Sequence, residues 1–113
     1  MLDDDADDLA PDDRYLLQDR YLDLTRNQLP ARARQEGWTL SNDHCFMRVI
    51  LDNLFLDCWD NHLDRRLRAY KQLSNQQLQE AIALAEKILR EGDEALRPLN
   101  AASLRWRGKS VRS

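Results

Sequence analysis

The sequence predicts an all-α fold: a single-domain bundle of three to four helices around a central hydrophobic helix. The first observation is composition. The chain has only three glycines and three prolines, and the helix formers Leu, Ala, Arg, Gln and Glu far outnumber β-branched residues. The second is size, because 113 residues with 42% hydrophobic content suit one core and one domain. The third is the helical spacing of the apolar residues, described below for each element.

The first helix is expected from about Asp13 to Gln28, where apolar residues cover roughly half of the circumference. Asp12 at its start suits both a helix cap and the positive end of the helix dipole. Pro30 is expected to end or kink the helix. A further turn is expected up to Glu36, where the following Gly37 stops it.

The central helix is expected from about Asn42 to Asn61, over the segment DHCFMRVILDNLFLDCW, the densest apolar run in the chain. A helix that is apolar on almost every side is normally buried. Cys45 and Cys58 would lie about 20 Å apart on this helix. A disulfide needs Cα atoms about 4.4–6.8 Å apart, so both cysteines are predicted to be buried free thiols.

The third helix is predicted from Asn75 to Glu91, with apolar residues recurring on one face. Ser74 and Gln77 have the spacing of a capping box, and Gly92 stands where a C-terminal cap is expected. The preceding residues, 62–73, are compatible with a continuing helix or with a looser basic connector.

A short fourth helix is expected to begin after Pro98 or Asn100 and to end near Trp106. The domain prediction is therefore a disordered acidic tail at residues 1–12, a helical domain at 13–107 and a basic C-terminal tail at 108–113. Residues 1–13 contain seven aspartates, so the −3 chain leaves about +4 on the rest, 17 basic against 13 acidic residues. The acidic tail solubilises the protein, covers basic residues of its own chain or binds a basic surface elsewhere.

The central helix carries His44, Arg48 and Asp52 at four-residue spacing, which places them on one slanting stripe. Arg48 and Asp52 are one turn apart and can form a salt bridge. His44 and Asp52 lie about 12 Å apart along the axis and cannot form a dyad without another helix. The stripe is thus either an internal ionic link in the core or, with Trp59, a polar pocket in which Arg48 binds an anionic small molecule.

A metal site is not predicted. Cys58 and His62 could face one ion, as could His44 and Cys45, but about 20 Å separates the two pairs on a continuous helix. No cofactor and no catalytic residue are predicted either. The chain lacks a glycine-rich phosphate loop, a Gly-x-Ser-x-Gly elbow, a Cys-x-x-Cys pair and a Glu-x-x-His motif.

Two basic segments are interleaved with aromatic residues. Arginine can bind phosphates or carboxylates through two parallel hydrogen bonds, and an exposed aromatic ring can stack on an unpaired base. The alternative is an ordinary solvated or interface surface. The candidate partner-binding or phosphate-binding residues are Arg65, Arg66, Arg68, Tyr70 and Lys71 in one segment and Arg105, Trp106, Arg107 and Lys109 in the other.

The predicted function is a small intracellular, non-catalytic interaction module that binds a protein or nucleic-acid partner through these segments. Its predicted location is cytoplasmic, because the N-terminus is acidic and no apolar run approaches the roughly 18 residues of a membrane span. One alternative is a small helical enzyme, or a subunit of one, that uses the polar pocket. Another is an acidic mimic of nucleic acid that acts as an inhibitor. A homodimer is left open, because the central helix is very apolar for so small a bundle.

Overall fold

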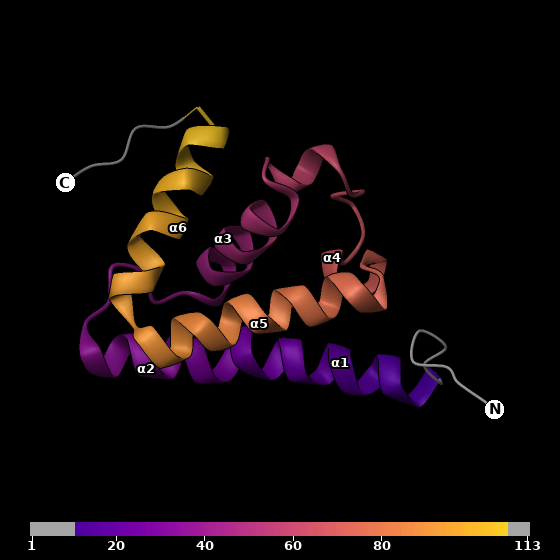
Figure 1. Cartoon of the computed structure of the whole chain (residues 1–113), viewed down its shortest axis with the longest axis horizontal. Coiled ribbons are helices and arrows are strands. Elements are labelled where there is room, and N and C mark those ends of the chain that lie inside the picture. The colour runs from indigo at the N-terminus through magenta and orange to yellow at the C-terminus, as the bar shows by residue number, and fades with distance from the viewer. Residues whose placement is uncertain (1–10, 109–113) are drawn as a thin grey trace.

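A computed structural model describes residues 11–108, and every regular element in that range is helical (Figure 1). The prediction of an all-α bundle is confirmed. The predicted tails fall largely outside the described range, at residues 1–10 and 109–113. Within residues 11–108, no helix has both the length and the apolar character needed to cross a membrane. In chain order the elements are α1 (Pro11–Asp23), a π-helical turn (Leu24–Gln28), α2 (Leu29–Glu36), α3 (Asp43–Phe55), a 3-10 turn (Trp59–Asn61), α4 (Ala69–Gln72), α5 (Asn75–Glu91) and α6 (Asp93–Trp106).

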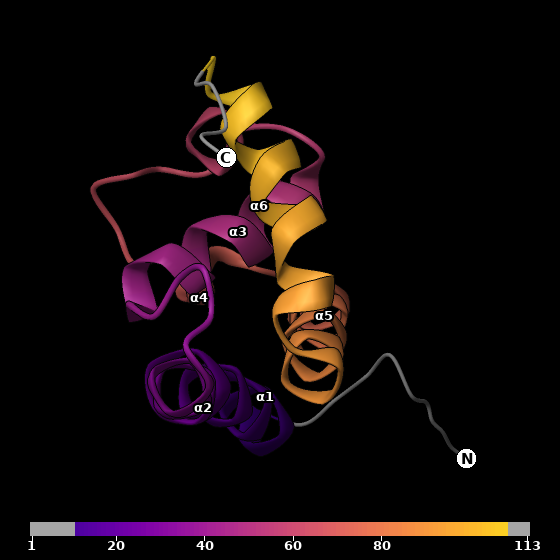
Figure 2. The same cartoon turned by 90° about the vertical axis from the view of Figure 1, so that its left-hand side faces the viewer.

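The helices form two pairs that are stacked on one another (Figures 1 and 2). The rod made of α1 and α2 runs beside α5 in the same direction, and Arg20 Nη2 lies 2.7 Å from Glu86 Oε2 between them. In the second pair, α3 and α6 lie side by side and also run in the same direction. A glycine with positive φ stands at each bend between the pairs, Gly37 at 69° and Gly92 at 76°. The chain therefore passes twice from the first pair to the second, from α2 to α3 after Gly37 and from α5 to α6 at Gly92.

The first helical run continues to Glu36, so the prediction that it ends near Gln28 is wrong. Proline lacks an N–H group, and its ring collides with the carbonyl one turn earlier in a regular α-helix. Here a wider π-helical turn ends at Gln28, two residues before Pro30, and changes that spacing. Within it, the buried Thr25 hydroxyl donates to the carbonyl of Tyr21 over 3.0 Å. The run then ends at Gly37, as expected.

The central helix α3 ends at Phe55, six residues before the predicted end at Asn61. Leu56 adopts the left-handed conformation with φ of 57° and leaves the helix with 71% of its surface exposed. Cys58 consequently lies beyond α3. Both cysteines are free, and both are half-buried rather than fully buried. The helix is still at the centre of the core, because its side chains Phe46, Val49 and Ile50 are inaccessible to solvent.

The third predicted helix is confirmed as α5, with the predicted bounds. Helix α6 begins at Asp93 rather than after Pro98, so that prediction is wrong. Asp93 favours the earlier start in two ways. Its negative charge suits the first turn of a helix. Its carboxylate also accepts two hydrogen bonds from Thr39, one from the backbone N–H over 2.8 Å and one from the side-chain hydroxyl over 3.0 Å. The residues between Asn61 and Ser74 form a connector with the short α4, not a continuing helix.

The core lies between the two helical pairs and receives side chains from every long helix. Its largest inaccessible side chains are Tyr21, Leu24, Leu29, Phe46, Ile50, Leu51, Leu73, Leu78, Ile88 and Leu96. Burial of such side chains contributes about 1.5–3 kcal/mol each before entropy is subtracted. The polar groups described next are built onto this frame.

The capping box at the start of α5 gives a first testable prediction. The Ser74 hydroxyl accepts the Gln77 N–H over 3.1 Å, and the Gln77 side chain accepts the Ser74 N–H over 2.9 Å. We expect Ser74→Ala to lower the free energy of unfolding by about 1 kcal/mol. Urea denaturation measures the change. Ser41→Ala is the matched control, because no hydrogen bond to the Ser41 side chain is found in the described structure. Equal effects of both substitutions would contradict the capping role.

Candidate functional site

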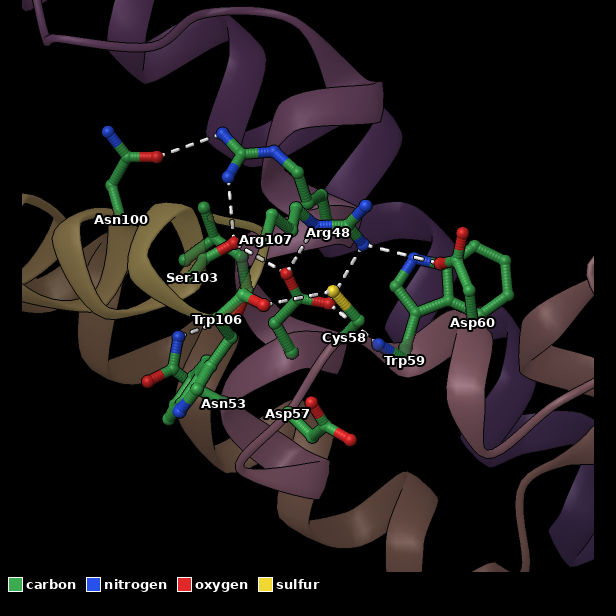
Figure 3. Close-up of polar contacts among 12 residues, drawn as sticks. Arg48, Asn53, Asp57, Cys58, Trp59, Asp60, Asn100, Ser103, Trp106 and Arg107 are labelled. Carbon is green, nitrogen blue, oxygen red and sulfur yellow. Dashed lines mark hydrogen bonds and ion pairs between the residues drawn. The ribbon is translucent and has the colours of Figure 1, made fainter. Parts of the chain in front are cut away.

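The polar stripe of α3 is organised around Asp52, a carboxylate that is completely buried in the last turn of the helix. Arg107, at the end of α6, binds it with two hydrogen bonds; Figure 3 shows Arg107 among the surrounding polar residues. Arg107 Nε donates to Asp52 Oδ2 over 2.7 Å, and Arg107 Nη2 donates to Asp52 Oδ1 over 3.0 Å. This forked geometry is the strongest form of ion pair between side chains. It joins α3 to the end of α6 through two residues that are 55 positions apart in sequence.

Two further donors complete the surroundings of the carboxylate. The Ser103 hydroxyl donates to Asp52 Oδ2 over 2.6 Å, and the backbone N–H of Trp59 donates to Asp52 Oδ1 over 2.9 Å. A carboxylate has about four acceptor positions, so all of them are filled here. Asp52 therefore has no free lone pair with which to take a proton from a substrate.

Arg48 reaches this carboxylate only through Ser103. Its Nη1 donates to the Ser103 hydroxyl over 2.7 Å, and its Nη2 donates to Asn100 Oδ1 over 2.8 Å. The direct salt bridge predicted between Arg48 and Asp52 is absent from the described structure. The physical reason is the neighbouring helix α6. Its Ser103 hydroxyl accepts from Arg48 and donates to Asp52, and Arg107 at its end supplies the two guanidinium bonds to the carboxylate.

The electrostatics explain why Asp52 needs so many partners. The end of α3 carries the negative end of the helix dipole, which disfavours a carboxylate there, and burial disfavours it further. Arg107 offsets both effects, and the hydrogen bonds to Asp52 in turn raise the pKa of Arg107 above its usual range. Asp60 adds a contact of 3.3 Å to Arg107 Nη2. The cluster thus fixes the last turn of α6 against α3 and the 3-10 turn.

The four residues of the alternative pocket do not converge in the structure. The side chain of His44 is 91% exposed, and its Nε2 lies 3.8 Å from Asp43 Oδ1. Trp59 contributes its backbone N–H to Asp52, while its half-buried ring packs against the core. The Cys58 thiol already has a hydrogen-bond partner, because it donates to the Trp106 carbonyl over 3.5 Å. Within residues 11–108 no group of three or more His, Cys, Asp or Glu residues could hold a metal ion.

The structure separates the predicted basic residues into two kinds. Arg107 belongs to the buried cluster, and Trp106 is half-buried beside it. Tyr70 is buried, and the Arg26 guanidinium lies over its ring, 5.9 Å from the ring centre. Arg105 is exposed at the end of α6. Lys109 lies outside the described residues. Neither aromatic ring of the two segments is therefore presented as a free stacking surface.

The remaining candidates form an exposed group on the connector between the 3-10 turn and α5. We call Arg65, Arg66, Arg68 and Lys71 the basic strip; all four are exposed. Residues 64–72 carry four cations against the single Asp64, a local charge of +3. Together with Arg105, this strip is the part of the predicted binding surface that is exposed among the described residues.

The strip has a defined backbone. The Gln72 side chain accepts the N–H of Asp64 over 2.8 Å and donates to the carbonyl of the same residue over 2.8 Å. Arg66 donates to the Asp64 carboxylate from Nε over 3.1 Å and from Nη2 over 3.0 Å, and these bonds lower the pKa of Asp64. Gln72 is a positioning residue that sequence reasoning missed, since a glutamine among basic residues carries no distinguishing signal.

The other strip cations are less engaged. Arg65 lies 3.9 Å from Asp60, with 75% of its side chain exposed. Among residues 11–108, neither Arg68 nor Lys71 has an ion-pair partner for its side chain. Leu67 stands between the arginines and is 59% exposed. The strip thus offers two cations with unused donors and an apolar side chain beside them.

Comparisons with known protein families, with characterised proteins and with solved structures find no match for this chain.

Proposed function

We propose that the protein is a small interaction module whose basic strip binds an acidic segment of a partner protein. The observation that carries the proposal is the exposure of Arg68 and Lys71, which have no ion-pair partner among the described residues, on a connector whose backbone is held by Gln72. Guanidinium groups bind carboxylates with two hydrogen bonds, so an acidic peptide is a fitting ligand.

The choice of a protein over a nucleic acid depends on the aromatic residues. Single-stranded nucleic acids are bound by basic grooves in which aromatic rings stack on the bases. Tyr70 is buried beneath Arg26, and Trp106 is half-buried next to the ionic cluster. In contrast, the exposed Leu67 suits a partner that presents apolar side chains among its carboxylates.

The ionic cluster supports a role in structure rather than in catalysis. Asp52 is inaccessible and already accepts four hydrogen bonds, and Arg107 is held in the same network. A general base must have a free lone pair within reach of a substrate proton. The polar groups that could have formed a pocket instead hold the helices together, and binding is assigned to the strip.

The test is a charge reversal of the strip. We expect the triple variant Arg65→Glu, Arg68→Glu and Lys71→Glu to bind a fluorescent glutamate- and leucine-containing peptide at least about ten-fold more weakly, since each exposed ion pair contributes about 0.2–1 kcal/mol and reversal adds repulsion. Fluorescence anisotropy measures the affinity at low salt and at about 0.15 M salt. Arg66 is left unchanged because it holds Asp64 in place.

The matched control makes the same change in net charge elsewhere. Arg34→Glu, Lys87→Glu and Arg90→Glu reverse three exposed cations on α2 and α5 and should leave the affinity nearly unchanged. An equal loss in both variants would mean that only net charge matters and would overturn the proposal. Tighter binding of a single-stranded oligonucleotide than of the peptide would identify nucleic acid as the partner class.

Sedimentation of each variant measures whether the chain forms the homodimer left open by its sequence.

A further inference from the structure

We propose that the chain carries its own competitor for the basic strip, in the acidic segment formed by residues 1–10. This segment has the sequence MLDDDADDLA, with five aspartates, no basic residue and a leucine near either end. It has the same chemistry as the partner assigned above, and the inference rests on that proposed function. The segment docks on the strip within one molecule and so weakens binding of the external partner.

The place where the segment joins the folded domain supports this docking. Helix α1 begins at Pro11, and Arg14, one turn later, reaches across to the strip. Arg14 Nη2 donates to the carbonyl of Lys71 over 2.9 Å, and Arg14 Nη1 donates to Asn75 Oδ1 over 3.0 Å. The start of α1 and the short helix α4 lie at the same end of the molecule (Figure 1). The acidic segment therefore joins the fold beside the last residue of the strip.

The reach of the segment is sufficient. Ten residues span at most about 33–36 Å, and the seven strip positions from Arg65 to Lys71 span at most about 25 Å. Asp8 is three residues before Pro11, so at most about 11 Å of chain separates it from the start of α1. A covalent link of so few residues gives a local concentration of the order of millimolar, which makes even a weak contact competitive.

The charges and the apolar side chains are complementary. The segment carries −5 from its aspartates, and residues 64–72 carry +3 from four cations and Asp64. Opposite charges attract within a Debye length of about 8 Å at physiological salt, so the attraction acts once the segment lies against the strip. Leu2 and Leu9 can approach the exposed Leu67. The same contacts that attract an external acidic peptide thus act inside the chain.

Zero-length carbodiimide cross-linking tests the docking directly in the full chain. The reagent joins a carboxylate to a lysine in contact with it, and the chain has three lysines, Lys71, Lys87 and Lys109. We expect aspartates of residues 1–10 to be joined mainly to Lys71. Lys87 is the internal control, because it is exposed on α5 next to Glu86. Mixing of isotope-labelled and unlabelled chains separates links within one molecule from links between molecules. Equal yields at Lys71 and Lys87, or links only between molecules, would overturn the docking.

A competition experiment tests the consequence. Asp3, Asp4, Asp5, Asp7 and Asp8 are all replaced by asparagine in one variant and by glutamate in the control, which preserves the charge. We expect the asparagine variant to bind the labelled acidic peptide about five- to ten-fold more tightly than the wild type, and the glutamate variant to match the wild type. Equal affinities of all three proteins would overturn the competition and leave the proposed function standing. If none of them binds the peptide, the proposed function and the competition both fail, whereas the cross-linking result still decides whether the segment docks.

Discussion

Replacement of Asp52 by asparagine is expected to destabilise the fold by about 3–5 kcal/mol, because it removes the carboxylate of a buried ion pair and leaves Arg107 with only its longer contact to Asp60. The amide also turns a nitrogen toward donors that now bind Oδ1 or Oδ2, namely the Ser103 hydroxyl, the Trp59 N–H or the guanidinium. A domain of this size has a total stability of about 5–15 kcal/mol, so the loss is a large fraction of it. Urea denaturation followed by circular dichroism measures the change.

Asp60→Asn is the matched control for this prediction. Asp60 also contacts Arg107, but it is 26% exposed and its contact is longer, 3.3 Å. We expect a loss below about 1 kcal/mol, because the pair is partly open to solvent and Arg107 keeps its two shorter bonds to Asp52. A double-mutant cycle of Asp52→Asn with Arg107→Met should show strong coupling between the two sites. If Asp52→Asn costs no more than the control, the ionic cluster is not the link that holds α6 against α3.

Replacement of Tyr21 by phenylalanine is expected to stabilise the protein by about 1–3 kcal/mol. The ring of Tyr21 is completely buried, and its hydroxyl is the one buried side-chain oxygen or nitrogen in the described structure that lacks a hydrogen-bond partner. An unsatisfied buried polar group costs about 1–3 kcal/mol, and phenylalanine removes the group while keeping the ring. Thermal and urea unfolding measure the gain. Tyr15→Phe, at a position that is 63% exposed, is the control and should change stability by less than about 0.5 kcal/mol.

The same residue predicts a dependence of stability on alkaline pH. Burial raises the pKa of the Tyr21 hydroxyl well above its ordinary value of 10.0, and the nearby charge of Arg26 offsets only part of that effect. The folded state therefore favours the neutral phenol. Below about pH 10 the tyrosine is neutral in the folded and unfolded states, so its ionisation does not affect the free energy of unfolding. Above pH 10 the unfolded tyrosine ionises first, and the free energy of unfolding falls as the pH rises toward the folded pKa. The difference between wild type and Tyr21→Phe should widen above pH 10. A constant difference across that range would contradict the burial of the hydroxyl.

Elements governed by neighbouring residues could be predicted from the sequence. Helix α5 begins and ends where its capping box and Gly92 place it, because both signals act within a few residues of the helix ends. The end of the first helical run at Gly37 is a second case, since glycine adopts the left-handed conformation without a steric penalty. The all-α class follows from composition in the same local way.

The misplaced boundaries occur where distant residues decide. Leu56 ends α3 in a left-handed conformation that no local signal indicates. The chain then folds back toward α3, and the Trp59 N–H donates to the Asp52 carboxylate in the last turn of that helix. Helix α6 begins at Asp93 because the carboxylate also binds Thr39, 54 residues away. Pro30 is passed without a break because a π-helical turn precedes it and buried Leu24 and Thr25 hold that turn in the core.

In the candidate site too, features contained in one short segment could be predicted from the sequence, whereas contacts between distant segments could not. The sequence by itself determined that α3 carries an ionic stripe in an apolar helix and that residues 65–71 are basic, because both features are contained in one short segment. Only the tertiary structure decided that Asp52 pairs with Arg107 instead of Arg48, and that Arg107 is internal while Arg68 remains exposed. The reason is physical. A buried charge selects its partner by position in three dimensions, and that position is set by the packing of α6 beside α3, which no spacing within either helix encodes.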